Sequence, residues 1–163
     1  MNDVRALRRT LAWVVGLNLG YFFIEVLIAV GIGSVSLFAD SIDFLEDTAV
    51  NTLILLALGW PLARRARVGK LMAIIICAPA VAALVMAAVK FSDPEPPDFW
   101  SLLVTAGGAI VVNTLCTWLL ARYRNEGGSL TRAAFLAARN DIIANAAIIA
   151  MAFVTLASRS GWP

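Results

Sequence analysis

The sequence contains no histidine, and this absence removes the commonest transition-metal ligand and the usual proton shuttle of proteins. It contains only two cysteines, Cys77 and Cys116, which both fall inside apolar runs. We therefore expect two buried small side chains and no disulfide framework. Charged residues are also scarce, at 15% of the chain with a net charge of +2, so no clustered basic face is available to bind nucleic acid. Carboxylates are left to carry any polar chemistry.

Apolar residues dominate what is present, at 61% of the chain with a mean hydropathy of +0.84, against about 45–50% in soluble domains. This composition predicts an integral membrane protein surrounded by the lipid bilayer. A helix of about 20 apolar residues crosses the hydrocarbon core, and five such runs occur, at residues 11–32, 35–61, 71–89, 100–120 and 130–157. We predict an all-α, polytopic transmembrane helical bundle that forms a single domain over residues 1–163.

The distribution of positive charge predicts the orientation of these spans. Basic residues gather before the first run, between the second and third, and between the fourth and fifth: Arg5, Arg8, Arg9, Arg64, Arg65, Arg67, Lys70, Arg122, Arg124 and Arg132. Short loops rich in Lys and Arg stay in the cytoplasm, so we expect a cytoplasmic N-terminus. The Pro-rich, mostly acidic segment before Trp100 suits the opposite side. The bacterial inner (plasma) membrane is the expected location.

Three aspartates are expected near the middle of the membrane. Asp43 and Asp47 lie about 12 and 18 Å along the second run, which starts outside, at 1.5 Å per residue. Asp141 lies about 16 Å along the fifth run, which starts in the cytoplasm. Helices that run from opposite faces therefore bring the three acids to one level. An acid at mid-membrane costs on the order of 2.5–3.5 kcal/mol on insertion scales and usually has a function.

The spacing of these residues predicts a cation site. Asp43 and Asp47 are i,i+4 neighbours on one helix face, while Ala137, Asp141 and Asn145 share a face of the fifth run. Two carboxylates about 6 Å apart stay ionised together only with a cation between them, and otherwise one takes a proton. A divalent cation that competes with protons at Asp43, Asp47 and Asp141 is the minimum needed for metal/proton exchange.

A structural interpretation of the polar residues stays open beside the functional one. The acids could pair with Arg139 or with nearby hydroxyls, and Arg139 itself could be a counter-charge or could extend to the cytoplasm. We expect Asp40 to stabilise its helix or the neighbouring helices, and Glu46 belongs to a different face from Asp47. Glu25 and Asn18 in the first run are expected to be interhelical hydrogen-bond partners rather than ligands.

Two segments resemble the signatures of the cation diffusion facilitator family. "GSVSLFADSIDFLED" is similar to its second-span signature, in which an acidic or His ligand precedes an Asp by four residues, here Asp43 and Asp47. "SLTRAAFLAARNDIIANAAII" resembles its fifth-span signature, of which Asp141 is present while the other ligand position holds Ala137. The resemblance implies a homodimeric six-span transporter that exports divalent metal ions in exchange for protons.

The departures from that family pattern shape the expected chemistry. Ala137 leaves three carboxylates, so water or Asn145 would complete the ligand shell, with lower affinity. An all-oxygen site favours harder cations such as Mn²⁺, Mg²⁺ or Fe²⁺ over a tight Zn²⁺ site, and the candidate cations are Mn²⁺, Fe²⁺, Co²⁺, Zn²⁺ and Cd²⁺. The resemblance would place a sixth span and a cytoplasmic domain after the last residue of this sequence. We therefore expect the chain to contact a partner chain, in a homodimer or in a heteromer.

The leading function from the sequence is divalent metal efflux by metal/proton antiport. The alternative is a non-transporting member of the same family that acts as a partner subunit or a metal sensor. An enzymatic alternative is a membrane phosphotransferase that joins lipid head groups, because such enzymes also hold metal with a DxxxD pair. They need a longer acidic motif before the pair, which "GIGSVSLFADSI" lacks, so we do not expect an enzyme.

Overall fold

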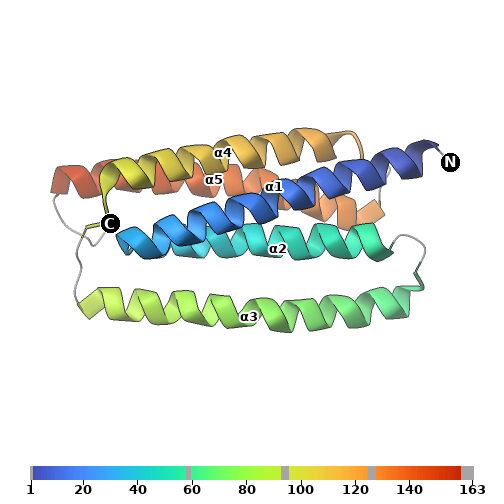
Figure 1. Cartoon of the computed structure of the whole chain (residues 1–163), viewed down its shortest axis with the longest axis horizontal. Helices are drawn as coiled ribbons and strands as arrows, with labels where there is room; N and C mark the ends of the chain where they lie inside the picture. Colours follow the sequence, from blue (N-terminus) through green and yellow to red (C-terminus); the bar gives the residue numbers. More distant parts are fainter. Residues whose placement is uncertain (1, 58–59, 93–95, 125–127, 159–163) are drawn as a thin grey trace.

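The computed structural model describes residues 2–57, 60–92, 96–124 and 128–158. Five α-helices run roughly along its long axis (Figure 1): α1 (Asn2–Ile32), α2 (Val35–Ala57), α3 (Leu62–Ser92), α4 (Phe99–Ala121) and α5 (Gly128–Ser158). The described residues contain no strand. The all-α class expected from the sequence is therefore confirmed, with one helix for each apolar run.

Three of the helices are long and apolar enough to cross a membrane, over Val4–Ile32, Phe99–Ala121 and Thr131–Ser158. The second helix carries four acids within 23 residues, which sets it apart from these three. Many α3 side chains lie outside the described residues. Five spans and a cytoplasmic N-terminus therefore stay predictions. The described part of α2 ends at Ala57, and residues 58–59 of the expected run 35–61 lie outside the described residues.

The connection between α1 and α2 is a two-residue turn that sets them side by side. Gly33 has a φ of 65°, a conformation that costs a residue with a side chain but not glycine. The Ser34 amide donates to the carbonyl of Ala29 at 2.9 Å, and the Gly33 amide donates to that of Val30 at 3.4 Å, as in a Schellman motif. The Ser34 hydroxyl then accepts from the amide of Leu37 at 3.3 Å and caps α2.

The start of α4 is capped by Asp98, which follows two prolines. Its carboxylate accepts a hydrogen bond from the Ser101 amide at 2.8 Å. Hydrogen bonding from Ser101 holds the pKa of this exposed carboxyl below its ordinary value. The sequence "PPDFW" thus begins α4 with a negative charge at the helix N-terminus.

Helix packing leaves α3 at one side of the bundle. The helix pairs α1 with α2 and α4 with α5 form the most extensive contacts, and α1 also packs on α4 and α2 on α5. In the described part of the chain α3 contacts only α2, as Figure 1 illustrates. Cys116 on α4 is buried, as expected, but the expectation for Cys77 is wrong because this thiol is exposed. It lies on α3, the helix that packs least against the others.

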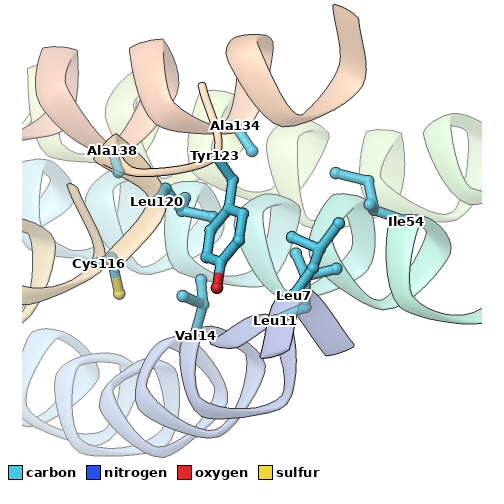
Figure 2. Close-up of a cluster of buried hydrophobic side chains, with 9 residues drawn as sticks. All are labelled: Leu7, Leu11, Val14, Ile54, Cys116, Leu120, Tyr123, Ala134 and Ala138. Atoms are coloured by element: carbon cyan, nitrogen blue, oxygen red, sulfur yellow. The ribbon is translucent and has the colours of Figure 1, made fainter. Parts of the chain in front are cut away.

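The interior has two apolar clusters with polar side chains between them. One cluster combines residues from α1, α2, α4 and α5 and Tyr123, which follows α4 (Figure 2): Leu7, Leu11, Val14, Ile54, Cys116, Leu120, Tyr123, Ala134 and Ala138. The other lies toward the α1–α2 turn: Ala29, Leu37, Leu102, Ala106 and Ala152. Most of the buried polar residues fall between the two clusters on their helices: Asn18, Glu25, Asp40, Ser41, Asp47, Asn51, Asn113 and Asn145. The bundle therefore encloses a polar middle layer.

Candidate metal centre between α2 and α5

The sequence-predicted ligands lie in the polar middle layer but differ in exposure. On α2, Asp47 is buried whereas Asp43, one turn earlier, is exposed. On α5, Asp141 is half-buried and Asn145 is fully buried. Their helices pack against each other, and they run antiparallel, since each apolar cluster joins the start of one helix to the end of the other. The two predicted ligand pairs therefore lie on neighbouring antiparallel helices.

The three aspartates are electrostatic neighbours across this interface. Asp141 on α5 interacts with both Asp43 and Asp47 on α2, and these two also interact with each other. Each interaction is a repulsion between like charges, which is lowered when a cation or a proton joins the group. The packing thus places Asp43, Asp47 and Asp141 within electrostatic range of one another, and their role as a shared site stays a prediction.

The carboxylates do not form a closed ligand shell. Among the described residues, no three acids or thiols lie close enough together to hold a metal ion. The family's remaining ligand position is occupied by Ala137, which is half-buried on the face of α5 that carries Asp141. Binding of one cation by all three aspartates therefore requires their side chains to converge, with water at the remaining positions.

Asn145 forms no hydrogen bond with the carboxylates of the three aspartates among the hydrogen bonds of the described residues. Its amide nitrogen donates to the Asp40 carboxylate at 2.8 Å and to the backbone carbonyl of Asp141 at 3.0 Å. The hydrogen bond to Asp40 joins α5 to α2, so Asn145 acts here as an interhelical contact. Asp40 is likewise buried, which fits the expectation that it stabilises the neighbouring helices.

Glu25 extends this buried contact to α1. Its side chain is fully buried and lies beside the Asp40 carboxyl group. Sequence reasoning expected a hydrogen-bonding role for Glu25 but did not connect it with Asp40 and Asn145. The sequence showed that these three polar residues stand inside apolar runs. It did not show that they meet, because that depends on how α1, α2 and α5 are aligned along their axes.

Two other polar residues, Asn18 and Arg139, have different surroundings. The Asn18 side chain on α1 accepts a weak hydrogen bond from the Cys116 thiol on α4, with 3.9 Å between the sulfur and the oxygen. Asn18 is therefore an interhelical partner, as expected. Arg139 is exposed, and its guanidinium donates to the neighbouring Asn140 at 3.5 Å.

Comparison with families of known proteins gives one match for this chain. Residues 11–162 match the model of the cation efflux transmembrane domain. The matched segment contains all of α2 and α5 and therefore every candidate ligand named above. No curated protein and no solved structure matches the chain.

Proposed function

Because the chain belongs to the cation efflux family of divalent metal ion transporters, we propose that it exchanges a divalent metal ion for protons through Asp43, Asp47 and Asp141. The observation that carries this proposal is the electrostatic repulsion between Asp141 and both α2 aspartates. Acids that repel one another in a largely apolar bundle are stabilised by either a cation or protons. Metal and proton are thus alternative occupants of one site.

The proposed mechanism is alternating access around this site. In one conformation the three aspartates converge on the cation, and in the other they are protonated and release it. The difference in exposure between Asp43 and Asp47 gives the cation a path, because Asp43 can be reached from outside the bundle while Asp47 lies inside. The carboxylates release protons when the metal binds.

The proposal includes a membrane topology and a cation class. We propose five spans with a cytoplasmic N-terminus in a bacterial inner membrane, efflux as the direction, and a homodimer as the working assembly. With no histidine in the chain, the oxygen ligands favour Mn²⁺ or Fe²⁺ over Co²⁺, Zn²⁺ and Cd²⁺.

A second candidate function rests on Ala137. An alanine on the ligand face of α5 removes one donor, and a weak site suits a non-transporting partner subunit or a metal sensor. Such a protein would bind the cation between α2 and α5 without moving it. Metal flux by the purified chain alone distinguishes the two functions.

The test is a flux assay with purified protein in liposomes. Uptake of Mn²⁺, Fe²⁺, Co²⁺, Zn²⁺ and Cd²⁺ is followed under an imposed proton gradient, for wild type and Asp141→Asn. Asp98→Asn is the control, because it changes a carboxylate at an exposed helix cap. We expect flux in wild type and the control and none in Asp141→Asn. Equal flux in all three proteins would remove Asp141 from the mechanism, and absence of flux in folded wild type would favour the second candidate.

A further inference from the structure

A second group of oxygen atoms lies beside the three aspartates, at the contact of α1, α2 and α5. It consists of Glu25, Asp40 and Asn145, whose exposed fractions are 0%, 3% and 0%. Asp40 precedes Asp43 by three residues and Asn145 follows Asp141 by four. Since α2 and α5 are antiparallel, Asp40 and Asn145 are both displaced from these aspartates in the same direction, toward the α1–α2 turn. The group therefore lies about one helical turn from Asp43 and Asp141.

Four oxygen atoms in this group are buried without a hydrogen-bond partner. They are both carboxylate oxygens of Glu25, the second carboxylate oxygen of Asp40, and the amide oxygen of Asn145. The Asn145 side chain points into the group, because its nitrogen donates to the first Asp40 oxygen at 2.8 Å. An unpaired buried polar atom costs about 1–3 kcal/mol, so a ligand that pairs these oxygens would stabilise the group.

The Glu25 and Asp40 carboxyl groups are hydrogen-bonding partners for each other only when one of them carries a proton. The Tyr21 hydroxyl on α1 lies in the electrostatic surroundings of both acids, but it donates its proton to the Thr105 carbonyl at 2.6 Å. The buried charged residues within the described part of the chain are all acidic, with no Lys or Arg among them. The ligand therefore has to come from outside the protein.

We propose that Glu25, Asp40 and Asn145 bind a second divalent cation. Two carboxylates balance the charge of a divalent ion, and the amide oxygen of Asn145 adds a third ligating side chain. A proton provides a single donor and would leave most of these oxygens unpaired. Carboxylate and amide oxygens without nitrogen or sulfur suit hard cations such as Mg²⁺, Ca²⁺ and Mn²⁺. This site goes beyond the proposed function, which uses a different set of carboxylates.

The test counts Mn²⁺ ions bound to the purified full chain in lipid nanodiscs, by equilibrium dialysis with the free ion measured by electron paramagnetic resonance. We expect two ions per chain for wild type and one for Glu25→Gln, which keeps the side-chain shape but removes the charge. Asp47→Asn should also bind one ion, through loss of the other site. Tyr21→Phe is the matched control, because it removes a polar group from the same layer of α1, and it should bind two.

The outcomes separate this proposal from the proposed function. Equal counts in wild type and Glu25→Gln would overturn the second site. A loss in Tyr21→Phe as large as in Glu25→Gln would also overturn it, because general disturbance of α1 would then explain the result. An unchanged count in Asp47→Asn would contradict the proposed transport site alone. If Glu25→Gln does not fold, Asp40→Asn takes its place with the same expected loss of one ion.

Discussion

At the residue scale, the proposed transport site is defined by its three candidate ligands and by the alanine at a fourth position. The three aspartates are neighbours across the α2–α5 interface, and Ala137 stands on the same face of α5 without a donor atom. Carboxylate oxygens alone give little preference for Zn²⁺ over harder cations, whereas imidazole favours Zn²⁺. The identity of residue 137 should therefore control both affinity and metal preference.

Ala137→His tests this control of metal preference. The imidazole nitrogen would add a fourth ligand one turn before Asp141, so we expect Zn²⁺ to bind about tenfold more tightly, ~1.4 kcal/mol, with a smaller gain for Mn²⁺. Leu136→His is the control, since Leu136 is also half-buried but lies about 100° around α5. Isothermal titration with each metal measures the affinities, and an equal gain in both variants would contradict a site on the Asp141 face.

The sequence led to a predicted site at Asp43, Asp47 and Asp141 but gave no indication that Glu25, Asp40 and Asn145 lie together. Depth and i,i+4 spacing were enough to bring Asp43, Asp47 and Asp141 to one level, because helices have a fixed rise per residue. Glu25 and Asn145 each stand in apolar runs with no spacing rule that joins them. Their association depends on the position of α1 along the axes of α2 and α5, and side-chain packing determines that position.

At the element scale, α1 and α4 approach closely at Gly108. A side chain at this position would collide with the ring and hydroxyl of Tyr21 on α1. That hydroxyl donates to the carbonyl of Thr105 on α4, so the glycine permits the hydrogen bond that links the helices. The preceding glycine, Gly107, has open space where its side chain would be.

Gly108→Ala should therefore weaken the bundle while Gly107→Ala should not. The added methyl group displaces Tyr21, and overpacking of this kind costs about 1–3 kcal/mol. We expect the melting temperature in detergent to fall by several degrees for Gly108→Ala and to stay the same or rise for Gly107→Ala. Thermal unfolding followed by circular dichroism measures both, and similar melting temperatures would argue against a tight α1–α4 contact.

The helices were predictable from hydropathy, but their contacts and ends were not. Each apolar run became one helix, because a chain in lipid must satisfy its backbone internally. The Schellman turn at Gly33 and Ser34 depends on backbone geometry, and the apolar pattern carries no information about it.

At the scale of the whole molecule, the bundle is apolar outside and polar in its middle layer. Large apolar side chains cover its surface, including Leu27 at 73% and Trp118 at 73% exposure. Exposed apolar surface of this extent is found where a protein meets lipid. The buried acids and amides between the two apolar clusters are therefore shielded from lipid on the sides and from water at the ends.

The orientation of this bundle in the membrane can be measured by cysteine labelling. In a chain with Cys77 and Cys116 changed to Ala, we expect the Asp98→Cys variant to react with an impermeant maleimide in intact cells. The Arg124→Cys variant should react only after permeabilisation, because basic loops stay in the cytoplasm. Both positions are solvent-accessible, so the side of the membrane decides access to the reagent. The reverse pattern would place the N-terminus outside.

The most direct test of the central claim follows metal and protons in the same vesicles. A Mn²⁺ gradient is applied to proteoliposomes with no initial pH difference, and a trapped pH-sensitive dye reports protons while radioactive Mn²⁺ reports the metal. We predict that inward Mn²⁺ movement makes the vesicle interior more alkaline, and that Asp47→Asn stops both movements. Mn²⁺ uptake without a pH change, or unchanged uptake in Asp47→Asn, would contradict metal/proton exchange at these carboxylates.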